Sequence, residues 1–124
     1  MQDPVVFTFV ENAAGMAVME PGRVKPVTVL KSTGANVVVF AFDAGSVLRE
    51  HTADEPALLQ SIEGTVTVRL AGESLTLQPG DLLHIEPGVA HSVEAAESAR
   101  LQLTILQIDS PGPSRIPAPS EGGV

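Results

Sequence analysis

The chain has 124 residues, a formal net charge of −8 at pH 7, 44% hydrophobic residues and only 3% aromatic residues. This charge argues against a nucleic-acid interface or an anionic membrane face, because both partners require a basic surface. The sequence contains no cysteine, which excludes disulfides, cysteine zinc sites and thiol chemistry. The length fits one domain, and a core built from Val, Leu, Ile and Phe favours sheet over helix.

The opening decapeptide, MQDPVVFTFV, has no basic region and no long apolar run. Neither a secretion signal nor a membrane-spanning segment is therefore expected. The resulting expectation is a cytoplasmic protein.

Short apolar runs with the composition of β-strands begin near the N-terminus. They occupy residues 5–10, 24–30 and 36–42. The last two flank the segment KSTGA, where Gly34 supplies the positive φ that a tight turn needs. These runs predict strands joined by turns.

The second half of the chain continues the same pattern. Residues 65–70 alternate and lead through AGES into 74–77, which predicts a hairpin. Further strand-like runs follow at 82–87, 91–95 and 101–108. The segment 53–62 comes closest to a helical period, but Pro56 interrupts it. Short strands at a spacing of roughly 8–12 residues predict an antiparallel sandwich or barrel.

The composition changes at Asp109, after which the chain is rich in Pro, Ser and Gly. Such a segment buries too little apolar surface to offset the entropy lost on ordering. We expect one domain over residues 1–108 and a flexible tail over 109–124. We find no internal repeat.

Two turn-bounded segments each carry one histidine, His51 and His91. The first begins GSVLREH, and the second reads GDLLHIEPGVAH. The residues that shape their turns are expected to have a structural role: Gly45, Gly64, Gly80, Pro87 and Gly88.

This pair of segments resembles the two motifs of the cupin superfamily, the RmlC-like jelly-roll proteins, over about residues 35–108. The resemblance implies an all-β double-stranded β-helix, or jelly-roll, barrel with one divalent metal inside, such as Zn, Fe, Mn or Ni. The string HTADEPALLQSIEG is similar to that of small single-domain bacterial cupins of the cupin-2 type. In that subgroup the first metal motif is degenerate and the family level gives no settled activity.

Position by position, the resemblance places the metal ligands at His51, Ala53, Ala57 and His91. Alanine thus replaces a second histidine and an acidic ligand, so that two ligands of four remain. A tightly held first-row metal usually needs three or four protein donors. Two imidazoles alone predict weak metal binding.

Gln60 and Glu86 are further pocket candidates. Gln60 is the polar residue within ALLQSI, although strand alternation puts it on the face opposite to positions 57, 59 and 61. Glu86 is close in sequence to His91, and its carboxylate is expected to help hold the imidazole ring of His91 in place. His84 is expected to have a surface or packing role, and no residue is assigned as catalytic.

Three functions remain open. The preferred one is a barrel that binds a small acid or aromatic compound beside two imidazoles. The second is a metal-dependent oxidoreductase, dioxygenase-like, or an isomerase, in which His51 and His91 bind the metal and a small metabolite is the substrate. The third is metal-free acid–base catalysis by a histidine, for which the chain offers no tyrosine partner.

Assembly is predicted from the apolar runs 5–10 and 24–30, which lie outside the segment that carries the motifs. An unpaired apolar edge is an aggregation hazard. The resemblance implies that barrels of this type pack or exchange N-terminal strands. We therefore expect a homodimer.

Overall fold

The computed structural model describes residues 6–107, which form β-strands and one short 3-10 turn. The elements are η1 (Ala14–Met16), β1 (Val24–Ser32), β2 (Ala35–Phe42), β3 (Val47–His51), β4 (Ala57–Glu63), β5 (Val66–Leu70), β6 (Glu73–Leu77), β7 (Leu82–Ile85), β8 (His91–Glu94) and β9 (Ala99–Leu106). The predicted all-β jelly roll is confirmed. The expected tail, 109–124, lies outside the described residues. Within residues 6–107 no helix has the length and apolarity needed to cross a membrane.

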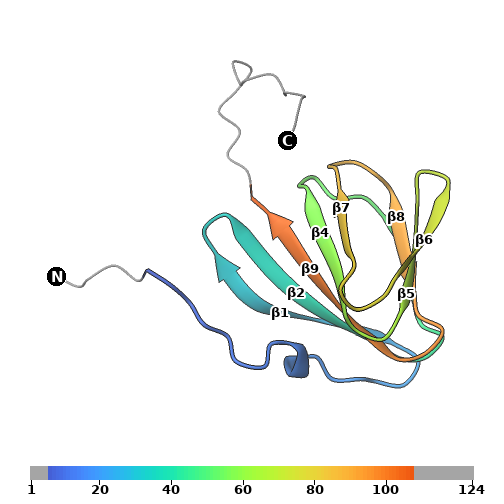
Figure 1. The fold of residues 1–124 in the computed structure, drawn as a ribbon, viewed down its shortest axis with the longest axis horizontal. Helices are drawn as coiled ribbons and strands as arrows, with labels where there is room; N and C mark the ends of the chain where they lie inside the picture. The colour runs from blue at the N-terminus through green and yellow to red at the C-terminus, as the bar shows by residue number, and fades with distance from the viewer. Residues whose placement is uncertain (1–5, 108–124) are drawn as a thin grey trace, which may run out of the picture.

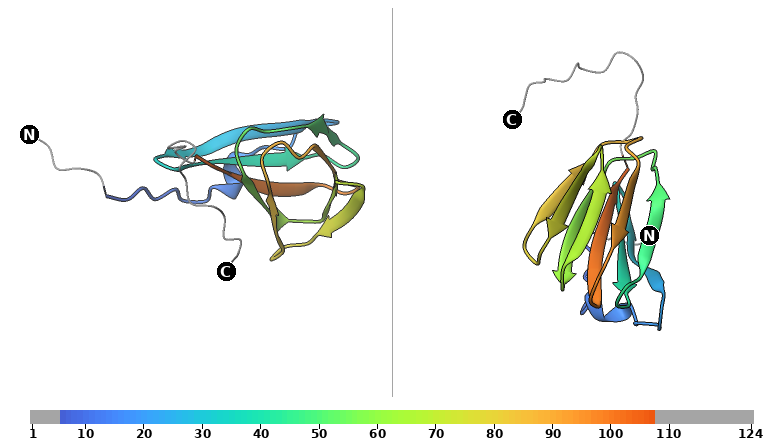
Figure 2. Two further views of the ribbon diagram at one scale, coloured as in Figure 1. Left: turned by 90° about the horizontal axis from the view of Figure 1, so that it is seen from above. Right: turned by 90° about the vertical axis from the view of Figure 1, so that its right-hand side faces the viewer.

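The strands form two antiparallel sheets (Figure 1). The five-stranded sheet has the order β1-β2-β9-β4-β7, and the four-stranded sheet has the order β3-β8-β5-β6. The pairs β2–β9, β3–β8, β4–β7 and β5–β6 are nested about the β5–β6 turn. Successive pairs alternate between the sheets, so one long hairpin is rolled into a barrel (Figure 2).

Both predicted hairpins are present. The β1–β2 turn contains Gly34 at φ 90°, as expected from KSTGA. In the β5–β6 turn, Ala71 and Gly72 have φ values of 51° and 78°. Two successive positive φ values are typical of the turns whose twist matches that of the flanking strands. Glycine favours positive φ at Gly34 and Gly72, whereas Ala71 adopts it against its own preference, with the flanking β5–β6 pairing on either side.

The segment 53–62, which came closest to a helical period, overlaps strand β4 over residues 57–62. Its burial alternates: Ala57, Leu59 and Ser61 point inward, and Leu58 and Gln60 are more exposed. This period of two is the pattern of a strand with one buried face. Pairing with β9 on one side and β7 on the other satisfies its backbone hydrogen bonds.

The core lies between the two sheets and consists almost entirely of aliphatic side chains. The buried cluster comprises Phe42, Ala57, Leu59, Val66, Val68, Leu77, Ile85, Val93, Ala95, Ala99 and Leu101. Because the chain has so few aromatic residues, branched aliphatic side chains from both sheets fill this interior. Close packing of such residues leaves little free space inside the barrel.

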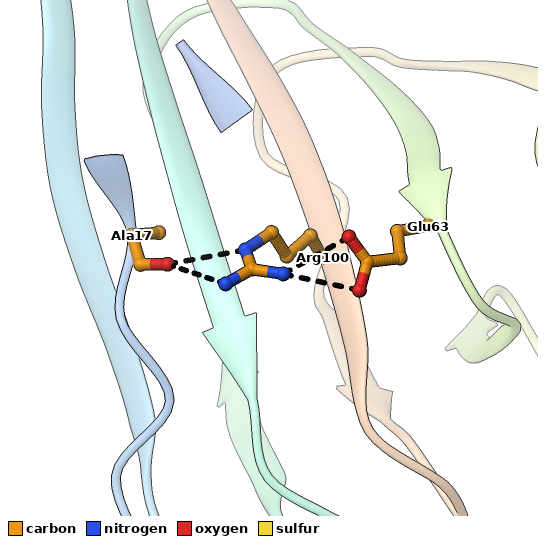
Figure 3. Close-up of polar contacts among 3 residues, drawn as sticks. All are labelled: Ala17, Glu63 and Arg100. Atoms are coloured by element: carbon orange, nitrogen blue, oxygen red, sulfur yellow. Dashed lines mark hydrogen bonds and ion pairs between the residues drawn. The ribbon is translucent and has the colours of Figure 1, made fainter. Parts of the chain in front are cut away.

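A second, smaller core covers the outer face of the five-stranded sheet. Here the segment after η1 packs Ala17 against Val39 and Ala41. The guanidinium of Arg100 fixes this segment (Figure 3), donating from Nε and Nη2 to the Ala17 carbonyl at 3.1 and 2.9 Å. Its Nη1 donates to both carboxylate oxygens of Glu63, at 2.9 and 3.0 Å. Arg100 thus joins the N-terminal segment to β4 and β9.

The predicted strand at residues 5–10 is wrong for its described part. Residues 6–10 belong to no strand, and Val6, Phe7 and Phe9 are exposed. The composition favours a strand, but a strand also needs a partner that supplies hydrogen bonds. Within residues 6–107 this segment has no such partner.

Gly64 ends β4 and provides a test of the packing at the barrel end. Its φ is 77°, and a Cβ placed on it would lie 2.7 Å from the carbonyl oxygen of Ser98. We expect Gly64→Ala to lower the free energy of unfolding by about 3 kcal/mol, since the strained φ and the backbone clash add. Denaturant unfolding measures this change.

The matched control is Gly72→Ala, because Gly72 has a φ of 78° and open space around the position of a Cβ. In this variant only the strained φ lowers the free energy of unfolding, by about 1 kcal/mol. If Gly64→Ala and Gly72→Ala lowered the free energy of unfolding equally, the predicted clash with the Ser98 carbonyl would be contradicted.

Candidate functional site

The two predicted pocket histidines face each other across the β3–β8 pair. Their Cα atoms are register partners. The ring centroids are 4.4 Å apart, with an angle of 59° between the ring planes. His91 is buried and His51 is exposed. The fold thus brings together two side chains that are far apart in the sequence.

A β-bulge in β3 puts His51 on the same side as Leu48. The register partners are Leu48 with Val93 and His51 with His91, so β3 has one more residue than β8 over this stretch. Regular alternation would place positions 48 and 51 on opposite faces. The extra residue reverses this, and both side chains line one cavity.

The backbone holds both imidazoles in the same way. Nδ1 of His51 lies 2.8 Å from the carbonyl oxygen of Arg49, and Nδ1 of His91 lies 2.9 Å from that of Val89. A carbonyl can only accept a hydrogen bond, so each Nδ1 carries the proton and donates it. In the neutral ring, Nε2 therefore keeps a free lone pair. Both rings present a hydrogen-bond acceptor or metal donor in a fixed orientation.

The cavity beside the two rings is small. Its volume is about 20 Å³, and its lining is otherwise apolar: Phe40, Leu48, Leu59, Val93, Leu101 and Leu103. This is on the order of the space that one water molecule occupies. A pocket for a typical organic ligand measures roughly 300–1,000 Å³. This cavity therefore has the size for a water molecule or an ion and is far smaller than a typical organic-ligand pocket.

A larger cleft, shallow and wide open to solvent, lies outside this cavity, between the edge strands β1 and β3 of the two sheets. Its volume is about 550 Å³. The lining residues are Arg23, Val24, Phe40, Val47, Leu48, Arg49, Glu50 and His51. Phe40, Leu48 and His51 line both the cleft and the inner cavity. The exposed ring of His51 thus lies where the two spaces meet.

The donors present do not fit a tightly held metal. Ala57 is buried in the core, and Ala53 donates no side-chain ligand. Among residues 6–107 no three His, Asp or Glu side chains are grouped so that they could share a metal ion. His51 and His91 supply two imidazole donors, fewer than first-row metals usually require.

The structure places the other sequence candidates away from this pair. Gln60 is exposed on the outer face of β4, opposite Gln102 and Leu82 in the register. Glu86 is exposed, and its carboxylate lies 3.9 Å from Nδ1 of His84. Neither Gln60 nor Glu86 lines the cavity or the cleft.

The motif glycines are in turns, and one of them links the two motifs. The backbone N–H of Gly88 donates to the carbonyl of Ala53 at 2.8 Å. Positive φ values occur at four of the singled-out positions: Gly45, Gly64, Gly80 and Gly88. Together with Pro87, these residues shape the backbone that presents the histidines.

Several cleft residues had no signal in the sequence. Phe40 lies in an ordinary apolar run, and Arg23 precedes a strand. Arg49 is inside the first motif, two residues before His51, but no motif position assigns it a role. Only the approach of β1 to β3 identifies these residues as neighbours.

Restoring a third donor tests the assignment of the histidine pair. We expect the wild type to bind less than one equivalent of Ni²⁺ or Zn²⁺, and Ala53→His to bind nearly one equivalent. The substitution adds an imidazole at the position that the resemblance implies for the second histidine. Elemental analysis of untagged protein after dialysis against the metal gives the measurement.

The control is Ala53→His combined with His91→Ala, which should return the metal content to the wild-type level. Metal retained by this double variant would show that the added imidazole binds without the histidine pair. Near-stoichiometric metal in the wild type, lost in both His51→Ala and His91→Ala, would contradict the two-donor assignment.

The profile of the AraC-like ligand binding domain family matches residues 36–112 of this chain. This match spans both histidine segments and most of the barrel. A search of the curated proteins finds no match.

Many solved structures are similar to this chain. A cupin superfamily protein from Desulfitobacterium hafniense DCB-2 is 16% identical with a TM-score of 0.70, covering 83% of this chain and 93% of that chain. An RmlC-like cupin from Shewanella frigidimarina NCIMB 400 is 22% identical with a TM-score of 0.67, covering 86% and 94%. KdgF from Halomonas sp. is 26% identical with a TM-score of 0.62, covering 74% and 86%. These likenesses show that the chain shares its fold with cupin barrels.

Proposed function

Because this chain belongs to the AraC-like ligand binding domain family, a cupin-type family, we propose that it binds a small organic molecule in the cleft between β1 and β3. The observation that carries this proposal is the shared lining of the cleft and the inner cavity by Phe40, Leu48 and His51. A ligand in the cleft would contact an apolar floor and one fixed imidazole at the same time.

The sizes of the two spaces support this location. The cleft, at about 550 Å³, is within the range of small-molecule sites, roughly 300–1,000 Å³. Apolar side chains provide area for burial, and a few polar groups would orient the ligand, which is the usual division of roles in such sites. The inner cavity would retain a water molecule next to the histidine pair.

A metal-dependent oxidoreductase or isomerase is the second candidate function. The favouring observation is that both rings keep Nε2 free while their Nδ1 atoms are held by backbone carbonyls. Metal-ligating histidines commonly have this second contact. Two imidazoles would hold a metal only weakly, and such a metal would supply Lewis-acid chemistry when bound. The metal analysis described above distinguishes this candidate from the first.

We also propose a homodimer formed through the N-terminal segment. Val6, Phe7 and Phe9 are 79%, 77% and 78% exposed. Burying such a side chain contributes about 2 kcal/mol, so three of them favour association strongly. A second copy of the chain is the proposed occupant, since its own strand edges would provide the hydrogen bonds that residues 6–10 lack.

Filling the cleft tests the binding proposal. In a thermal-shift screen of small carboxylates and phenols, we expect compounds of at least one class to raise the melting temperature of the wild type. Val47→Trp should weaken these hits at least about tenfold, since Val47 lines the cleft and is exposed. Calorimetric titration gives the affinities.

Leu82→Trp is the matched control, because Leu82 is also an exposed apolar residue on an edge strand, β7, and is outside the cleft. It should leave the affinities unchanged. A screen without any stabilising compound would count against the proposed function, as would hits that Val47→Trp does not affect.

Light scattering tests the dimer. We expect a mass of two chains at micromolar concentration for the wild type. Phe7→Ser with Phe9→Ser should shift the protein to the monomer because it removes most of the exposed apolar area of the segment. Val18→Ser, at another exposed site, should not. A wild-type monomer would refute the proposal.

A further inference from the structure

We propose that the ligand of the cleft is a small carboxylate with an apolar body, and that Arg49 is the residue that selects its charge. This inference rests on the proposed binding function and specifies the ligand class of the same site. It follows from the charges around the cleft and from the residues of its floor.

Arg49 is the arginine without an acidic partner in the described part of the chain. The other arginines of residues 6–107 each pair with a glutamate: Arg23 with Glu20 at 3.1 Å, Arg69 with Glu94 at 2.8 Å and Arg100 with Glu63 at 2.9 Å. Among residues 6–107 Arg49 makes no ion pair, and it lines the cleft. An arginine in the lining of a cleft that makes no ion pair has a guanidinium available to bind a planar carboxylate through two parallel hydrogen bonds.

Arg23 adds a second cation to the lining. Its ion pair with Glu20 is largely exposed, the two side chains being 67% and 44% accessible. Exposed pairs of this kind are weak, and Glu20 also contacts Lys25 at 3.2 Å. A ligand carboxylate could therefore compete with Glu20 for Arg23 at little cost.

The charge of the lining contrasts with that of the whole protein. The cleft is lined by two arginines and one carboxylate, Glu50, and Arg23 also has Glu20 and Lys25 beside it. These three cations and two carboxylates leave one positive charge, whereas the chain has a net charge of −8. A local excess of positive charge in an acidic protein attracts a small anion to this place over the rest of the surface. One excess positive charge matches a monoanion.

The floor of the cleft specifies the rest of the ligand. Four side chains in the lining present apolar surface: Val24, Phe40, Val47 and Leu48. A hydrocarbon body would cover this surface, whereas the hydroxyl groups of a polyol would find no hydrogen-bond partners on it. His51 lies beyond Arg49 on β3 with its Nε2 free. A hydroxyl group on the ligand's body would have an acceptor there.

Pairs of charged and uncharged probes test this inference. The probes are benzoate with benzyl alcohol, and hexanoate with 1-hexanol, titrated calorimetrically into the intact protein at low salt. We expect at least one carboxylate to bind about tenfold more tightly than its alcohol. Arg49→Gln should weaken that carboxylate about tenfold and leave the alcohol unchanged, because only the charged hydrogen bonds are lost.

Lys31→Gln is the charge-matched control. Lys31 is exposed on β1, outside the cleft, and its replacement removes the same amount of positive charge from the protein. It should leave all four affinities unchanged. Equal weakening by Arg49→Gln and Lys31→Gln would show a general field effect and overturn the role of Arg49.

The remaining outcomes separate this inference from the proposed function. In one outcome the alcohols bind as tightly as the carboxylates, Arg49→Gln has no effect on either, and Val47→Trp weakens both. This result would overturn the carboxylate as the ligand class and would keep the cleft as the binding site. Phenyl phosphate binding more tightly than benzoate through Arg49 would overturn it in favour of a phosphate ester. Binding of both probe types that Val47→Trp leaves intact would overturn the cleft itself.

Discussion

The pairing of β3 with β8 is the constraint on which the candidate site depends. This pair is one step in a hairpin that rolls up about the β5–β6 turn. The rolling brings His51 opposite His91, and the bulge before His51 turns its side chain toward the inside. If β3 ran without the extra residue, the ring would point away from its partner. Register therefore determines the chemistry as much as residue type does.

The same rolling explains why the interior is nearly full while the edge is open. Both sheets contribute branched aliphatic side chains to one core, and close packing leaves a space of about 20 Å³ beside the histidines. The edge strands β1 and β3 belong to different sheets and share no hydrogen bonds. Side chains alone fill the gap between these edges, and the result is a cleft of about 550 Å³. Of the two histidines, only His51 lines this cleft as well as the inner cavity.

Much of the fold could be predicted because its signals are local. The hairpin turns at Gly34 and Gly72 follow from residues that accept positive φ, and the second histidine motif indicated the barrel. Strand-like composition failed at residues 6–10, since a strand requires a partner that composition does not supply. The clamp of Arg100 on the Ala17 carbonyl could not be foreseen either, because its two ends are far apart in the sequence.

The sequence by itself determined the fold class, the two candidate histidines and the loss of two donor positions to Ala53 and Ala57. Residue type and spacing give the short strands and the two histidine segments, and the resemblance of those segments to the cupin motifs implies the barrel and the donor positions. Only the tertiary structure decided that the His51 and His91 rings are 4.4 Å apart and that Arg49 and Arg23 line one cleft. Those outcomes depend on strand register and on which sheet edges approach each other. Contacts between residues distant in the chain set both, and no short segment encodes them.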